Sequence, residues 1–185
     1  MLQIIIQGRG GQGAQLAGSL IATAFFAEGR EVQSFATYGG ARRGTPVSSF
    51  IRVDDKPIRL RCDIERADAL LCFDASLLEG KFLAAAGPSS WVVVNSRLGA
   101  EHFTKVLPTY RVLPVDGLEI AAKNGLRRIV NSALLGALAA AIGAPKLETL
   151  IATVTAEAPK SASANVAACV EGYNRVVAQF ARAAA

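Results

Sequence analysis

Residues 2–13 read Leu2-Gln3-Ile4-Ile5-Ile6-Gln7-Gly8-Arg9-Gly10-Gly11-Gln12-Gly13, an apolar run that ends in a cluster of glycines. The three consecutive isoleucines are stiff at χ1 and favour a buried β-strand over residues 2–7. The glycines then predict a tight turn. Apolar residues recur every three or four positions after it and predict a helix from about Gln12 to Glu28. Strand, turn and helix in this order make the first half of a βαβ unit.

The turn is a candidate anion site because it opens a helix. The first N–H groups of a helix have no partner within it, and the helix dipole adds partial positive charge there. Such a terminus attracts anions, phosphates above all. We therefore predict cofactor-binding roles for Gly8, Gly10, Gly11, Gln12 and Gly13. Alternatively, the glycines only permit a tight turn and close packing of the helix on the strand.

A dinucleotide-binding site also requires an acidic residue at the end of the second strand, and this sequence has none there. An Asp or Glu should close the second strand, roughly 20 residues after the turn, and hold the ribose hydroxyls. The second predicted strand, residues 31–36, ends instead in Ala36-Thr37-Tyr38, and Glu31 stands at its start. A stand-alone nucleotide-binding protein, or an NAD(P)- or flavin-dependent dehydrogenase, is therefore kept only as the alternative function.

A second loop, Tyr38-Gly39-Gly40-Ala41-Arg42-Arg43-Gly44, follows that strand. This loop and the glycine turn both lie at the carboxyl ends of strands that we predict to be adjacent. Open α/β sheets bind ligands there, so the two should face one crevice. Arg42 or Arg43 suits a phosphate or carboxylate because a guanidinium can make two parallel hydrogen bonds. The same arginines fit equally well in a solvated loop, or paired with a carboxylate of a neighbouring subunit. Tyr38, Arg43 and Gly44 complete the predicted cofactor-binding set.

The rest of the chain continues the alternation of strands and helices. Strands are predicted near residues 68–73 and 91–95, a β-hairpin near 47–60, a weak edge strand at 110–114, and helices through most of 116–185, including 147–155 and 164–181. We therefore predict one domain over residues 1–185. Its fold class is α/β: a doubly wound, mainly parallel sheet with an inserted hairpin and a helical C-terminal part.

Three polar residues stand apart from this pattern. Asp74 follows the strand at 68–73 and should cap a helix that runs to Ala86, although a site role stays open. Asn131 lies in an apolar helix, where a buried amide needs partners; it either anchors the backbone of a neighbouring loop or faces a ligand. His102, the single histidine, is expected at the surface.

Composition narrows the classes of function. Hydrophobic residues make up 51% and charged residues 19%, a balance that suggests a surface covered by a partner. The net charge of +5 comes without a dense basic run that interleaves aromatics, so it favours a polyanionic small molecule or an acidic subunit over nucleic acid. Cys62, Cys72 and Cys169 are too scattered for a zinc site or an iron–sulfur cluster. Signal and membrane-spanning patterns are absent, and we expect a cytoplasmic location.

Several motifs together resemble one family. They are Gly8-Arg9-Gly10-Gly11-Gln12-Gly13, Tyr38-Gly39 with Arg43-Gly44-Thr45-Pro46-Val47, the stretch 50–58, Ala67-Asp68 with Asp74, and Asn131-Ser132-Ala133-Leu134-Leu135-Gly136. In this order they resemble the γ subunit, or domain III, of 2-oxoacid:ferredoxin oxidoreductases, which include the pyruvate, indolepyruvate and phenylglyoxylate enzymes. One departure is Ala41, where many members carry an acidic residue.

The resemblance implies that this chain is part of an enzyme that catalyses an oxidative decarboxylation. A 2-oxoacid, coenzyme A and ferredoxin or another electron acceptor would give an acyl-CoA, carbon dioxide and the reduced acceptor. Thiamine diphosphate would supply the carbanion chemistry and iron–sulfur clusters would take the electrons, with both held by partner subunits. This chain would then carry no catalytic residue and no metal, and would be inactive alone. Coenzyme A would enter as a co-substrate, with a phosphate as the anion of the predicted site.

Overall fold

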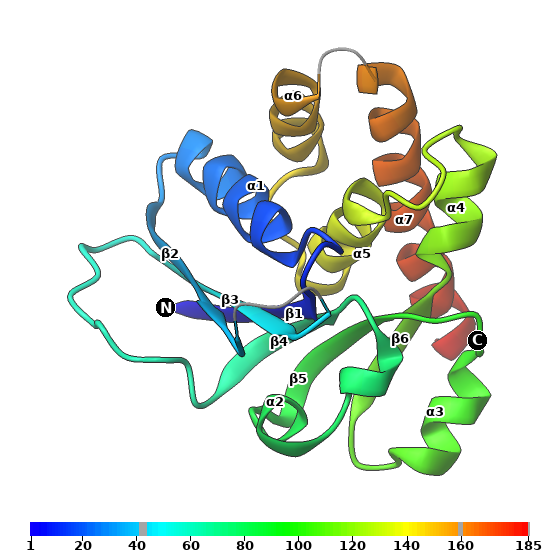
Figure 1. Ribbon diagram of the computed structural model, residues 1–185, viewed down its shortest axis with the longest axis horizontal. Coiled ribbons are helices and arrows are strands. Elements are labelled where there is room, and N and C mark those ends of the chain that lie inside the picture. Colours follow the sequence, from blue (N-terminus) through cyan, green and yellow to red (C-terminus); the bar gives the residue numbers. More distant parts are fainter. Residues whose placement is uncertain (41–43, 159–160, 185) are drawn as a thin grey trace.

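The computed structural model describes residues 1–40, 44–158 and 161–184, and places helices on both faces of one sheet (Figure 1). The strands are β1 (Leu2–Arg9), β2 (Glu31–Tyr38), β3 (Pro46–Asp54), β4 (Ala67–Cys72), β5 (Ala86–Asn95) and β6 (Arg111–Val115). The helices are α1 (Ala14–Ala27), the 3-10 helix η1 (Ala75–Leu77), α2 (Gly80–Ala84), α3 (Ala100–Val106), α4 (Gly117–Lys123), α5 (Asn131–Ile142), α6 (Leu147–Glu157) and α7 (Ala162–Ala183).

The sheet has the strand order β2-β3-β1-β4-β5-β6 within the described residues. β1, β4, β5 and β6 pair in parallel, whereas β3 runs antiparallel to both β1 and β2. β2 therefore points in the same direction as β1, and its carboxyl end lies at the same edge of the sheet. The predicted α/β class with a mainly parallel sheet is confirmed, as is the weak edge strand, which is β6.

Two predictions about strand pairing were wrong. The hairpin is formed by β2 and β3, not by two strands within residues 47–60, and residues 58–61 form no strand. β2 is also not the neighbour of β1, because β3 lies between them. The physical reason is that both edges of β3 are already occupied: Val53 pairs with Leu2 of β1 and with Val32 of β2, which leaves no free edge for a further strand.

The segment after β4 also differs from the prediction. Asp74 caps a helix as expected, since its Oδ1 accepts a hydrogen bond from Ser76 N at 3.1 Å, but the capped helix is the short η1. A helix running to Ala86 is wrong, because Glu79 is extended and Gly80 has a φ of 54°, in the left-handed region. The chain resumes as the short α2, and β5 begins at Ala86, earlier than the expected residue 91.

The core lies on both faces of the sheet, and β1 is at its centre. Ile4 and Ile6 belong to the cluster shared with α1, α5 and α7, and Ile5 belongs to the cluster shared with α2 and α3. All three side chains are buried, each worth about 1.5–3 kcal/mol of stabilisation. Figure 1 shows α1, α5, α6 and α7 on one side of the sheet and α2 and α3 on the other. The helical C-terminal part is confirmed, and none of the described helices is long and apolar enough to cross a membrane.

Candidate anion-binding site

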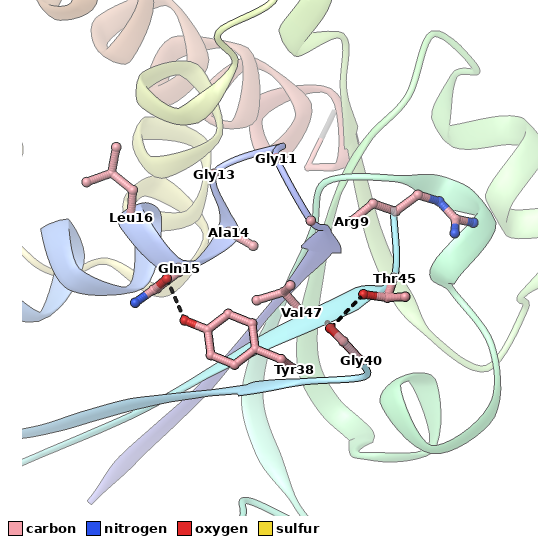
Figure 2. A pocket seen from close by; sticks show the side chains of 11 residues that line it. Arg9, Gly11, Gly13, Ala14, Gln15, Leu16, Tyr38, Gly40, Thr45 and Val47 are labelled. Atoms are coloured by element: carbon pink, nitrogen blue, oxygen red, sulfur yellow. Dashed lines mark hydrogen bonds between the residues drawn. The ribbon is translucent and has the colours of Figure 1, made fainter. Parts of the chain in front are cut away.

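A cleft of about 700 Å³ lies at the carboxyl edge of the sheet, between the turn after β1, the start of α1 and the end of β2 (Figure 2). It is lined by Arg9, Gly10, Gly11, Gly13, Ala14, Gln15, Leu16, Tyr38, Gly40, Thr45 and Val47. The structure thus brings the glycine turn and the Tyr38 loop together, even though β3 separates their strands. Of the residues predicted to form the site, Gly10, Gly11, Gly13 and Tyr38 line the cleft, and Arg43 lies outside the described residues.

The turn after β1 is stabilised by hydrogen bonds between two of its own residues, Arg9 and Gln12. Gln12 Oε1 accepts a hydrogen bond from Arg9 N at 2.7 Å, and Gln12 N donates to Arg9 O at 2.9 Å. The Gln12 side chain therefore supports the turn from within and does not line the cleft. Gly8 is also buried beneath the turn, because a Cβ there would lie 3.0 Å from the Phe73 Cβ. Gly11 is different: it has a φ of 95°, and a Cβ there would meet open space.

The start of α1 is anchored from below by Asn131, the first residue of α5. Gly13 is the N-cap, with a φ of 91°, and no side chain caps the helix. Asn131 Nδ2 donates to Gly13 O at 2.9 Å, and a Cβ on Gly13 would lie 2.5 Å from that nitrogen. Asn131 is buried, so the anchoring role that its sequence context allowed is the observed one. The first turn of α1, at Ala14 and Gln15, borders the cleft without a cap.

The loop after β2 is hydrogen-bonded to the glycine turn. Gly10 N donates to Thr45 O at 2.9 Å, and Gly44 N donates to Gly10 O at 3.4 Å. On the opposite wall, the Tyr38 hydroxyl donates to Gln15 Oε1 at 2.6 Å, as Figure 2 shows. These contacts fix the width of the cleft, because each joins one of its walls to the other. Gly44 thus belongs to the frame of the cleft and not to its lining.

Arg9 is a site residue that the sequence reasoning missed. Its Nε lies 2.8 Å from Asp74 Oδ2, Nη2 donates to Ser76 Oγ at 2.8 Å, and Nη1 donates to Gly44 O at 3.3 Å. The guanidinium ties the ends of β1 and β4 to the loop after β2, and in Figure 2 it points away from Tyr38. The signal in the sequence that could have identified Arg9 is its position between Gly8 and Gly10. Because its charge is paired with Asp74, the role of Arg9 in the cleft is structural: it connects the segments that form the cleft.

The Arg9–Asp74 ion pair makes the stability of the folded chain depend on pH. Burial raises the pKa of Asp74, but hydrogen bonds from Ser76 and the guanidinium of Arg9 outweigh it, and the pKa is lowered on balance. A lowered pKa contributes stability above the pKa of the unfolded chain, about 3.9, and that stability is lost as the pH falls through the folded value. Because Arg9 is partly exposed, screening limits the contribution to about 0.5 kcal/mol.

We expect the Arg9→Gln variant to lose less stability on acidification than the wild type does. The measurement is urea unfolding of both proteins at pH 7 and at pH 3. Asp74→Asn is the matched comparison and should flatten the dependence at least as much, because it removes the titrating carboxyl together with its contacts to both Arg9 and Ser76. Equal pH dependence in all three proteins would show that the pair contributes nothing.

The described residues contain no group of three or more His, Cys, Asp or Glu side chains that could hold a metal ion. Burial raises the pKa of Cys72 and of Cys169 to about 12, so neither offers the thiolate that ligates metals at neutral pH. His102 lies at the surface, as expected. The dinucleotide alternative loses its geometric basis, because β3 displaces β2 from the side of β1.

The sheet, the glycine turn and the cleft define a doubly wound α/β protein with a cleft at the carboxyl edge of its strands, where proteins of this class bind their ligands. The family model described as pyruvate ferredoxin/flavodoxin oxidoreductase matches residues 3–175. The chain therefore belongs to this family.

Relatives of known name agree with that assignment. The chain is 39% identical over 153 residues to the pyruvate/ketoisovalerate oxidoreductases common subunit gamma of Thermococcus kodakarensis, covering 81% of this chain and 83% of the relative. It is 33% identical over 181 residues to pyruvate synthase subunit PorC of Methanocaldococcus jannaschii, covering 97% and 99%. The solved pyruvate oxidoreductase subunit PORC of Thermotoga maritima superposes with a TM-score of 0.82 at 29% identity, covering 94% and 95%. The resemblance to γ subunits of 2-oxoacid oxidoreductases is confirmed.

Proposed function

We propose that this chain works as the γ subunit of an enzyme that oxidatively decarboxylates a 2-oxoacid to an acyl-CoA, and that its cleft holds an anionic group of coenzyme A. Family membership and the names of the relatives support the first part. In this proposal thiamine diphosphate and the iron–sulfur clusters belong to partner subunits, and ferredoxin or another acceptor takes the electrons.

The cleft itself supports the second part. The uncapped first turn of α1 lies beside Gly11, whose missing side chain leaves open space for a ligand to approach the backbone. Backbone N–H groups at a helix start suit a phosphate, and they need no charged side chain. Leu16 and Val47 add apolar wall next to this polar end, which suits a molecule that joins a phosphate to an uncharged arm.

Arg43→Ala should raise the apparent KM for coenzyme A about tenfold to a hundredfold, or roughly 1.5–3 kcal/mol, if this arginine makes a charge-assisted contact with the anion. Arg43 lies outside the described residues, so its part in the site stays a prediction. The measurement is steady-state acyl-CoA formation by the assembled enzyme. Arg59→Ala is the control, because Arg59 is exposed on a loop at the opposite edge of the sheet.

The outcomes separate two roles for the loop. An unchanged KM in an intact complex would remove the anion site. Loss of the complex would assign the loop to the contact between subunits instead.

A further inference from the structure

A turn between α4 and α5 holds Arg127, Arg128 and Ile129 out into solvent; the exposed fraction of Ile129 is 57%. The residues on either side, Leu126 and Val130, are buried, and Ile129 N donates to Leu126 O at 3.0 Å. Arg127 has a φ of 55°, in the left-handed region that a residue with a Cβ rarely adopts. The fold thus holds the backbone of this turn so that three side chains point into solvent, with an arginine where a glycine would be less strained.

A second exposed pair lies just beyond the end of β5, and that end adjoins the turn. A Cβ on Gly117 would lie 3.2 Å from Val130 Cβ and 3.0 Å from Asn95 Oδ1, so the end of β5 adjoins the turn. Arg97 and Leu98 follow Asn95 in the chain, and the exposed fraction of Leu98 is 51%. We call the five exposed side chains the arginine patch, and they are Arg97, Leu98, Arg127, Arg128 and Ile129.

The charges of the patch are largely unpaired. In the part of the chain that the structure describes, Arg127 and Arg128 make no ion pair or side-chain hydrogen bond, and Arg97 has one long contact, 3.8 Å to Asp116 Oδ2. The patch also adjoins the cleft, because Asn131, two residues after Ile129, binds Gly13 O. In Figure 1 the connection from α4 leads to the start of α5 beside the turn after β1.

We propose that the arginine patch docks onto an acidic surface of another subunit of the enzyme, an inference that rests on the proposed function. Arginine is enriched in protein interfaces, because its weakly hydrated guanidinium forms paired hydrogen bonds with carboxylates. The exposed Ile129 and Leu98 favour a protein over a free anion, since a free anion would not cover apolar side chains. The net charge of +5 adds long-range attraction to an acidic partner. A subunit docked here would also border the cleft.

The double variant Arg127→Glu/Arg128→Glu tests this in the complex assembled with its thiamine diphosphate-binding and iron–sulfur subunits. Analytical ultracentrifugation over a series of KCl concentrations gives the dissociation constant of this chain from the complex. We expect the constant to rise at least tenfold, and the variant complex to dissociate at lower KCl than the wild type, because the contact is ionic. Lys56→Glu/Arg59→Glu is the matched control: it makes the same change in charge on an exposed loop at the opposite edge, and should leave the constant unchanged.

The Arg127→Gly variant distinguishes an effect on docking from an effect on the stability of the fold. Glycine adopts the observed φ without strain, so the melting temperature should hold or rise while the complex weakens. An unchanged dissociation constant in the double variant, or equal weakening by the control, would overturn the inference and leave the proposed function standing. An intact complex with a raised KM for coenzyme A would also overturn it, because the patch would then bind ligand. A wild-type chain that fails to join these subunits would overturn the proposed function, and the inference with it.

Discussion

Gly136→Ala should lower the free energy of unfolding by about 3 kcal/mol or more, although alanine is the better helix former. Gly136 lies in α5, where its Cα faces the backbone of α7. A Cβ there would overlap the carbonyl oxygen of Cys169, and a Cβ on Gly172 of α7 would overlap the carbonyl oxygen of Ala133 in the same way. The added methyl group meets main chain, which no change of rotamer can move. The two helices must separate, and the buried side chains between them lose contact.

Urea unfolding, followed by circular dichroism, measures the effect, and Gly172→Ala should repeat it. The control is Gly99→Ala, at a position with a φ of −76° and nothing within 4 Å of the added Cβ. Because Gly99 is the N-cap of α3, where alanine is less favourable than glycine, this variant should lose about 1 kcal/mol at most, well below the loss expected for Gly136→Ala. A Gly136→Ala protein as stable as the wild type would show that α5 and α7 can move apart freely.

Arg52→Met should cost about 3 kcal/mol of stability, because it removes a buried cation that donates to four hydrogen-bond acceptors from three segments of the chain. Arg52 lies in β3 and is 1% exposed. Its guanidinium donates to Gln3 Oε1 at 3.2 Å, Gln33 Oε1 at 2.7 Å, Cys62 O at 2.8 Å and Asp63 O at 3.1 Å. Methionine keeps the length of the stem and leaves these four acceptors without their donor. Lysine should restore only part of the stability, because it lacks the planar fork.

The same variant should loosen the segment between β3 and β4. Arg52 is what holds the carbonyls of Cys62 and Asp63 against the sheet, so trypsin should cut at Arg59 and Arg61 faster in Arg52→Met than in the wild type. Arg59→Met is the control for the unfolding measurement, since it removes an exposed charge and should change stability by less than about 0.5 kcal/mol. Unchanged stability together with unchanged cleavage would contradict the assigned role.

The candidate site was predictable where it depends on local chemistry. The glycine turn, its place between a strand and a helix, and the loop at Tyr38 all follow from neighbouring residues, and the structure brings them into one cleft. Whether the cleft binds an anion stays a prediction. The frame of the cleft was not predictable, because the partners of Arg9 lie in two other segments of the chain: Asp74 follows β4 and Gly44 follows β2.

The sequence by itself determined the buried strand at Ile4–Ile6, the turn at Gly8–Gly13, the cap at Asp74 and the helices of the C-terminal part. Each of these features depends on periodicity or on backbone preferences over a few residues, and both can be read directly from the sequence. The tertiary structure alone decided the neighbours of β3, the burial of Arg52 and the reciprocal contact of Gly136 with α7. Alternation along β3 shows which side chains share a face, but backbone hydrogen bonds are alike in every strand and do not choose the partner. The burial of Arg52 requires acceptors from β1, β2 and the 55–66 segment at one point, and only the folded chain brings them together.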